Sequence, residues 1–156
     1  MSKEKCVLYT HSYDINPCVI ISINSKGDSK YEGAAPYLKN HENVKDVLFL
    51  YFDDVEPYEL FEYDDLFLFT SNQARSILDF IEKWMFDVEE IIIHCHSGIS
   101  RSSAVASGIC LFLGIDNSWT FENPYCPNEY VLKILFDAIK DLSLIHISEP
   151  TRLQLI

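Results

Sequence analysis

Cys95 and Arg101, separated by five residues, are the pair in this sequence best suited to chemistry. A cysteine thiolate is a strong nucleophile, and an arginine guanidinium can bind two phosphate oxygens at once. Gly98, between them, can take the backbone angles that a curled loop requires. The backbone N–H groups of such a loop, with the dipole of a following helix, suit a tetrahedral anion. The spacing therefore predicts a phosphate-binding loop with Cys95 as nucleophile and Arg101 as phosphate ligand.

The segments on either side of this loop predict a strand before it and a helix after it. The apolar run Glu90–His94 is typical of a strand, and a helical pattern runs from about Ser100 to 113, where Gly114 is a natural terminator. Two more helices are expected. One spans about 71–86, because Thr70 to Gln73 form a capping box and apolar residues follow at helical spacing; the last begins near Asn128.

Three other segments rich in β-branched and aromatic residues predict strands: Cys6–Thr10, Cys18–Ile23 and Val47–Phe52. The nearly continuous apolar character of Val47–Phe52 is typical of a strand buried on both faces of a sheet. Alternating strands and helices favour an α/β fold, with a central, mostly parallel sheet of about four to five strands flanked by helices. The phosphate loop is then expected at the carboxyl end of a central strand.

The run from His94 and Cys95 to Arg101 and Ser102 resembles the signature of the cysteine-dependent protein tyrosine phosphatases, most closely the small dual-specificity type. Ser97 departs from it mildly, because the family often has Ala there. Segments 48–54 and 125–128 further resemble a small bacterial and phage branch. The resemblance covers about residues 5–141. It implies a phosphomonoester hydrolase acting on phosphotyrosine, phosphoserine or phosphothreonine in proteins, through a cysteinyl-phosphate intermediate and without cofactor.

The resemblance also implies roles for single residues. Ser102 would steady the thiolate as it departs, and His94 would order the loop. The general acid would come from the loop after the third strand; Asp54 fits the family register best, Asp53 is the neighbouring candidate, and Asp64 and Asp65 stay open. The phosphate would lie against the loop backbone and the guanidinium, which together comprise His96, Ser97, Gly98, Ile99, Ser100 and Arg101.

A metal site at His94, Cys95 and His96 is not expected. Zinc ligands normally stand at recognisable separations, and adjacent residues at the end of a strand point to opposite faces.

Composition narrows the choice of partners. The 156 residues suit one domain, and a formal net charge of −12 argues against nucleic acid or anionic lipid as the main partner. No secretory signal or long apolar span is evident. The five cysteines show no paired spacing, which predicts free thiols in the cytoplasm. The expected partner is a phosphorylated protein or peptide; the oligomeric state is not indicated.

The last residues, Leu142 to Ile156, look like a reading frame of a sequencing-library adapter, so the domain is expected over 1–141 and a non-native tail over 142–156. Two other functions stay open: a non-catalytic phosphate-binding module, and a phosphatase acting on a non-protein phosphate. A reversible disulfide between Cys95 and either Cys110 or Cys126 also stays open.

Overall fold

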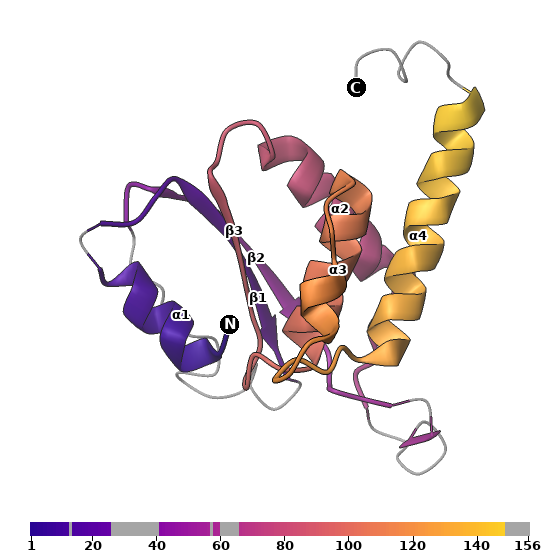
Figure 1. The fold of residues 1–156 in the computed structure, drawn as a ribbon, viewed down its shortest axis with the longest axis horizontal. Helices are drawn as coiled ribbons and strands as arrows, with labels where there is room; N and C mark the ends of the chain where they lie inside the picture. Colours follow the sequence, from indigo (N-terminus) through magenta and orange to yellow (C-terminus); the bar gives the residue numbers. More distant parts are fainter. Residues whose placement is uncertain (13, 26–40, 57, 60–65, 149–156) are drawn as a thin grey trace.

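The computed structural model of the chain describes residues 1–12, 14–25, 41–56, 58–59 and 66–148, and the side chains of these residues as far as 143. Helices and strands alternate along most of this part of the chain (Figure 1). Their order is α1 (Lys3–Thr10), β1 (Cys18–Asn24), β2 (Val44–Tyr51), α2 (Ser71–Trp84), β3 (Glu90–His94), α3 (Arg101–Leu113), the 3-10 helix η3 (Ser118–Phe121) and α4 (Glu129–Ser148).

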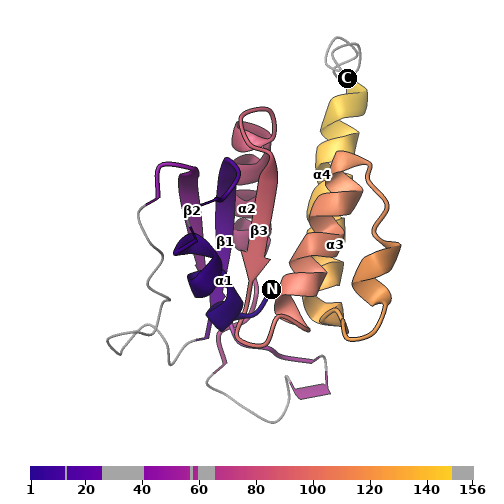
Figure 2. The same ribbon diagram turned by 60° about the vertical axis from the view of Figure 1, so that its left-hand side comes forward.

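The three strands form one parallel sheet in the order β2-β1-β3. Helix α1 covers one face of this sheet, and α2, α3 and α4 lie on the other (Figures 1 and 2). Strand β1 is buried along its whole length and serves both faces. Its residues Val19, Ile21 and Ile23 join the main core beneath the three helices, whereas Cys18 and Ile20 join a smaller core beneath α1. This is the two-residue alternation of a strand covered on both sides.

Helices α2 and α3 begin and end close to their expected positions. The capping box of α2 is present: the Thr70 hydroxyl accepts from the Gln73 N–H, and the Gln73 side chain accepts from the Thr70 N–H. Helix α2 ends at Trp84, two residues before the expected end. Helix α3 ends where Gly114 takes a φ of 69°, a left-handed conformation that suits glycine at this position.

The expected strand over Cys6–Thr10 is wrong, because these residues form most of helix α1. The Ser2 side chain caps the helix by accepting from the Lys5 N–H. Cys6 and Thr10, four residues apart, are both buried, since one side of the helix packs on the sheet. The local preference of β-branched and aromatic residues for strands is outweighed here by the cap and by packing. The described residues therefore form a three-stranded sheet.

Two expectations about positions in the sheet are also corrected. Strand β2 lies at one side of the described sheet and is only partly buried, with Phe49 45% exposed; burial on both faces belongs to β1 instead. The strand that leads into the loop, β3, lies at the opposite side and not in the centre. On its outer side β3 meets the N-terminal residues, through an isolated parallel bridge between Ser2 and Cys95.

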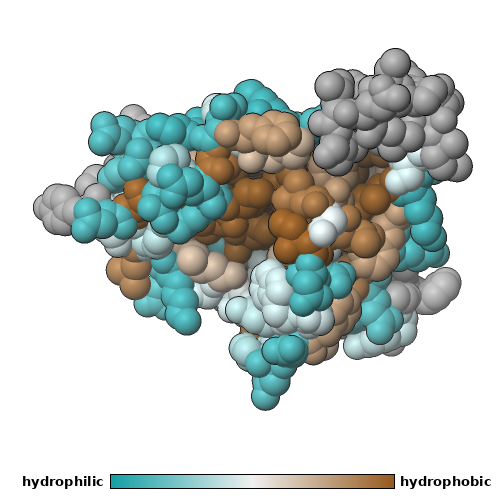
Figure 3. Space-filling view, turned by 45° about the horizontal axis from the view of Figure 1, so that its top comes forward, coloured by the Kyte–Doolittle hydropathy of each residue, from teal (hydrophilic) through white to brown (hydrophobic). Residues whose placement is uncertain are grey.

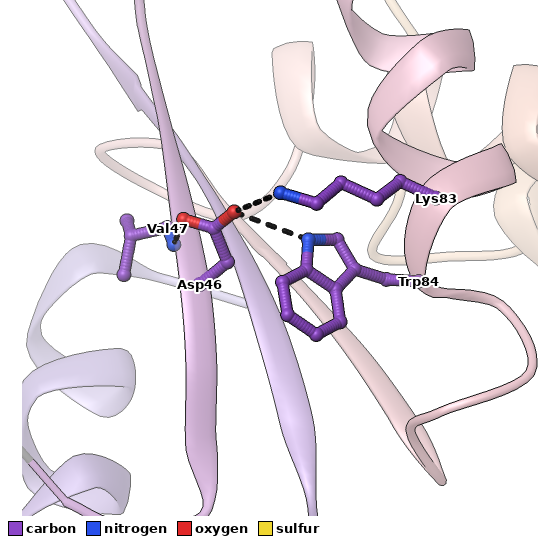
Figure 4. A network of polar contacts seen from close by, with 4 residues as sticks. All are labelled: Asp46, Val47, Lys83 and Trp84. Atoms are coloured by element: carbon purple, nitrogen blue, oxygen red, sulfur yellow. Dashed lines mark hydrogen bonds and ion pairs between the residues drawn. The ribbon is translucent and has the colours of Figure 1, made fainter.

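A polar contact fastens the end of α2 to β2. Asp46 Oδ2 accepts from Trp84 Nε1 at 3.1 Å and lies 3.5 Å from Lys83 Nζ, while Asp46 Oδ1 accepts from the Val47 N–H (Figure 4). Since Lys83 and Trp84 belong to the last turn of α2, this contact links the end of the helix to β2.

The face shown in Figure 3 carries apolar side chains across its middle, with polar side chains around them. A pocket of about 200 Å³ lies between β3 and α3, and Trp119 and Tyr125 are among the residues that line it. Among the helices of the described residues, none combines the length and the apolar character needed to cross a bilayer.

Candidate active site

The loop between β3 and α3 carries the cysteine and the arginine singled out from the sequence. Strand β3 ends at His94, and α3 begins at Arg101. Gly98 has a φ of 79°, in the left-handed region that residues with a Cβ rarely adopt. A Cβ at this position would also lie 2.5 Å from the Met1 carbonyl carbon. Glycine is therefore required both by the backbone angle and by the closeness of the N-terminal residues.

The Cys95 thiol is buried and faces hydrogen-bond donors. The Gly98 N–H donates to Cys95 Sγ at 3.2 Å, and Ser102 Oγ lies 3.3 Å from the same sulfur. Burial raises the pKa of the Cys95 thiol, but the Ser102 hydroxyl, the N–H groups of Ser102 and Gly98, and the charge of Arg101 outweigh it and leave the pKa below the ordinary value. In the thiolate state the Ser102 hydroxyl donates to the sulfur. This arrangement favours the thiolate over the thiol.

The Arg101 guanidinium has hydrogen-bond partners at one nitrogen, Nη1, and, within the part of the chain that the structure describes, none at another, Nε. It is only 5% exposed, and its Nη1 donates at 2.9 Å to both Ser25 Oγ and the Phe52 carbonyl. Its Nε is buried and has no hydrogen-bond partner among the described residues. Buried donors are almost always paired, so the position of Nε suits an acceptor that the protein itself does not supply.

His94 lies behind the loop and is fully buried. Burial lowers its pKa to about 4, so the imidazole is neutral at neutral pH. Its Nδ1 lies 3.5 Å from the Cys95 carbonyl oxygen, and its Nε2 lies 2.7 Å from Ser22 Oγ on β1. The imidazole thus connects the loop to the central strand of the sheet.

The two aspartates after β2 have different surroundings. Asp54 is exposed, and its Oδ1 accepts from Ser100 Oγ at 2.8 Å and from Asn128 Nδ2 at 2.9 Å. Asp53 instead closes its own loop: its Oδ2 accepts from the Phe67 N–H, and its N–H donates to the Phe67 carbonyl. Asp54 is therefore attached to the loop that bears Cys95. The other two candidates, Asp64 and Asp65, lie outside the described residues.

Asn128 was not singled out as a site residue, yet it joins three parts of the site. Besides Asp54, its Nδ2 donates to the Val55 carbonyl, and its N–H donates to the Ser100 carbonyl. Its Oδ1 accepts from the Val131 N–H and so caps α4. An Asn just before a helical pattern is a recognisable cap, but its contacts with the two loops depend on tertiary structure and leave no pattern in the sequence.

The N-terminal residues also contact the loop. The Met1 amino group donates to the Ile93 carbonyl at 3.0 Å, the Cys95 N–H donates to the Met1 carbonyl at 3.4 Å, and the Lys3 N–H donates to the His96 carbonyl at 3.3 Å. The residues before and within the loop are thereby held from their outer side.

The remaining candidates lie on the outer part of the loop. His96, Ser97 and Ile99 are exposed, and Ser100 is half-buried. On the inner side, the Ser103 hydroxyl donates to the carbonyls of Ile99 and Ser100 and fixes the turn into α3. The cysteines considered for a disulfide, half-buried Cys110 and exposed Cys126, are both free thiols. In the part of the chain that the structure describes, no three His, Cys, Asp or Glu side chains gather as a metal site would require.

Comparison with known proteins gives likeness in structure only. No family model matches the sequence, and no curated protein matches it. The crystal structure of Tk-PTP in its active form aligns with a TM-score of 0.54 at 16% identity, covering 90% of this chain and 88% of that one. The human tyrosine phosphatase-like serine/threonine/tyrosine-interacting protein aligns with a TM-score of 0.51 at 17% identity, covering 83% and 78%. The chain has a protein tyrosine phosphatase-like fold. At these identities the likeness establishes the fold alone.

Proposed function

We propose that this protein is a cysteine-dependent phosphatase that hydrolyses phosphomonoesters on phosphorylated proteins or peptides. The observation that carries the proposal is the pairing of a hydrogen-bonded sulfur with an unsatisfied guanidinium nitrogen. Cys95 Sγ lies against donors that favour the thiolate, and Arg101 Nε is buried without a partner among the described residues. A phosphoryl oxygen is the acceptor that Arg101 Nε lacks. An anion at this position would lie at the start of α3, where the helix dipole is favourable.

In the first step the Cys95 thiolate attacks phosphorus and forms a sulfur–phosphorus bond, while the bond from phosphorus to the substrate oxygen breaks. Arg101 and the loop N–H groups bind the equatorial oxygens, whose negative charge is stabilised as transfer proceeds. Asp54 protonates the leaving oxygen. Both hydrogen bonds to its carboxylate fall on Oδ1, which leaves Oδ2 available to carry the proton.

In the second step a water molecule attacks phosphorus, and the sulfur–phosphorus bond breaks. The Asp54 carboxylate, which lost its proton in the first step, takes a proton from the water. The departing sulfur regains its negative charge next to the Ser102 hydroxyl and the Gly98 N–H, 3.3 and 3.2 Å away. Inorganic phosphate leaves, and the thiolate is ready for another substrate. No cofactor takes part in this scheme.

The charge around the site favours a protein substrate over nucleic acid. Burial raises the pKa of Glu56, and the negative charges of Asp54, Glu129 and Glu59 raise it further, so four carboxylates lie close together beside the Asp54 loop. Together with the net charge of −12, they repel a polyanion. We propose the cytoplasm as the site of action, because all five cysteines are free and a thiolate nucleophile needs a reducing compartment.

Hydrolysis of p-nitrophenyl phosphate in the presence of EDTA tests the proposal. We expect release of nitrophenol, inhibition by vanadate, and loss of turnover by at least about a thousandfold in Cys95→Ser, because the serine hydroxyl is a far weaker nucleophile than the thiolate. Cys126→Ser, which changes an exposed thiol, is the matched control and should keep its activity. Activity in Cys95→Ser close to that of the wild type would refute the proposal.

A non-catalytic phosphate-binding module is the second candidate. It is favoured by the exposure of Asp54, and by the fact that one structural neighbour is described as a phosphatase-like interacting protein. Both candidates bind vanadate or phosphate, but only the enzyme turns over. Binding of a phosphopeptide by calorimetry with no release of phosphate would favour the module. Hydrolysis of a small non-protein phosphate in preference to a panel of phosphopeptides would favour the other substrate class.

A further inference from the structure

A chain of three buried polar side chains leads from the middle of the sheet to the loop that carries Cys95. Ser22 and Asn24 lie on β1, and His94 ends β3; their exposed fractions are 0%, 1% and 0%. Asn24 Nδ2 donates to Ser22 Oγ at 3.1 Å and to the Ser22 carbonyl at 3.2 Å. Ser22 Oγ lies 2.7 Å from His94 Nε2, and His94 Nδ1 lies 3.5 Å from the Cys95 carbonyl oxygen. In an otherwise apolar strand, a buried serine directed at an imidazole and a buried asparagine directed at that serine need a reason, because burying polar side chains is unfavourable unless they are hydrogen bonded.

The partners of the imidazole determine where its proton lies. The Cys95 carbonyl can only accept, so Nδ1 must carry the hydrogen that points at it. At neutral pH His94 is uncharged, because burial lowers its pKa to about 4. Nε2 is then without hydrogen and accepts, so the Ser22 hydroxyl must donate to it. The Asn24 amide donates to Ser22 Oγ from another side and leaves the serine hydrogen free for His94.

We propose that Ser22 and Asn24 are positioning residues for the nucleophile, and that they act by fixing His94 in the tautomer with hydrogen on Nδ1. This inference rests on the proposed function. Neither residue touches the substrate. In this tautomer the imidazole attracts the Cys95 carbonyl and holds the first peptide of the loop, so that the N–H groups further along converge on the sulfur. In the other tautomer a bare nitrogen would face the carbonyl oxygen and repel it.

Nitrogen NMR of the histidine side chains reads the tautomer directly in the wild-type protein. Chemical shifts of the ring nitrogens separate a protonated nitrogen from a bare one, and His94→Asn identifies the signals. We expect a neutral His94 with hydrogen on Nδ1 at pH 7.5. A neutral ring with hydrogen on Nε2, or an imidazolium, would overturn the proposal. The tautomer itself is read in the wild-type protein, and the variant serves only to assign the His94 signals.

Ser22→Ala tests the effect on the nucleophile. It removes the donor to Nε2, and we expect the apparent pKa of the Cys95 thiol to rise by about half a unit to one unit, which is the size of one hydrogen bond of moderate strength. The pKa is measured from the pH dependence of iodoacetamide labelling, followed by mass spectrometry of the Cys95 peptide. Ser22→Thr keeps a hydroxyl and should restore both the tautomer and the pKa. Asn24→Ala should shift the pKa in the same direction by less.

Ser107→Ala is the matched control. Ser107 is also a fully buried serine with one polar neighbour, and its Oγ accepts from Asn117 Nδ2 at 3.0 Å, away from His94. A loss of stability alone would affect both serine variants, whereas the proposal requires a shift of the Cys95 pKa in Ser22→Ala only. Equal pKa values in the two variants would overturn it. Because neither labelling nor NMR requires turnover, a protein with the expected tautomer and no hydrolysis would refute the proposed function and leave the positioning role intact.

Discussion

The loop that carries Cys95 and the loop that carries Asp54 are held in different ways. The first buries Cys95 and Gly98, is bonded along its backbone to the N-terminal residues, and ends at Arg101, whose Nη1 donates to Ser25 and Phe52, the residues that directly follow β1 and β2. The second presents an exposed Asp54, attached by two side-chain hydrogen bonds to Ser100 and Asn128. In the proposed mechanism, the group that must stay ionised and fixed is hydrogen bonded and buried, whereas the group that must gain and lose a proton keeps its access to solvent. The difference predicts that substitutions in the two loops will lower the phosphatase activity in distinguishable ways.

Arg101→Lys should have the largest effect, because it changes the Cys95 loop at the group that we propose binds the phosphoryl oxygens. A lysine supplies the charge but neither the two-pronged geometry nor the contacts that Nη1 makes to Ser25 and Phe52. We expect kcat/KM for p-nitrophenyl phosphate to fall by about a thousandfold. Arg75→Lys, on the exposed surface of α2, should leave it unchanged. A loss of less than about tenfold in Arg101→Lys would contradict the bidentate role.

Asp54→Asn should be next in size, and its effect should depend on the substrate. With a phosphotyrosine peptide, whose leaving group needs a proton, we expect kcat to fall by about a hundredfold; with a strongly acidic leaving group the change should be small. Asp53→Asn is the control, since Asp53 bonds to Phe67 and closes its own loop. Its effect should be the same for both substrates. If Asp53→Asn shows the dependence on leaving group instead, the roles of the two aspartates are exchanged.

Ser102→Ala should have a smaller effect, concentrated in the second step. Without the hydroxyl 3.3 Å from the sulfur, the thiolate is a poorer leaving group and the intermediate breaks down more slowly. We expect steady-state turnover to fall by about tenfold, with a rapid first release of nitrophenol that equals the amount of enzyme. Ser107→Ala should show no such burst. Slower release in the first turnover, with no accumulation of intermediate, would argue that Ser102 only orders the helix start.

The smallest effect concerns stability. The pKa of His94 is about 4 in the folded protein and 6.5 in an unfolded chain. As the pH falls below 6.5, His94 takes up a proton in the unfolded state before it does so in the folded state. The contribution of His94 to the free energy of unfolding is therefore complete above pH 6.5 and is lost between pH 6.5 and 4. At pH 5 the loss is roughly 2 kcal/mol, measurable by urea unfolding at pH 7.5 and 5. His94→Asn should lack this part of the pH dependence, whereas His96→Asn, at an exposed position, should retain it. Equal slopes in wild type and His94→Asn would show that His94 does not contribute.

Local patterns predicted much of the fold. The capping box at Thr70, the glycine after α3 and the apolar runs of β1 and β3 each depend on residues close together in the chain. The strand predicted over Cys6–Thr10 was wrong because an N-cap at Ser2 and burial of one helix side outweigh β propensity. Ser2 and the spacing from Cys6 to Thr10 were signals of a helix, but weak ones in a segment of eight residues.

The residues of the candidate site also divide into those that a local pattern predicts and those that depend on packing between distant segments. Cys95, Gly98 and Arg101 could be predicted because one short loop holds them together. Asn128 and Ser22 could not, because each meets the loop only after distant segments have packed, and a single Asn or Ser in a sequence does not indicate which segment it will contact. The burial of Arg101 Nε without a partner is likewise visible only in three dimensions.

The contact between Gly98 and the backbone of Met1 and Ser2 has a consequence for biosynthesis. Residues 1–3 are translated well before the loop that they brace, which is complete only when α3 has begun. At about 5–20 residues per second, the two segments are made roughly 5–20 seconds apart. On the ribosome, the loop around the Cys95 sulfur therefore takes shape only after α3 has begun, and a nascent chain stalled ahead of Cys95 leaves the polar backbone of residues 1–3 without the neighbours that it has in the finished protein.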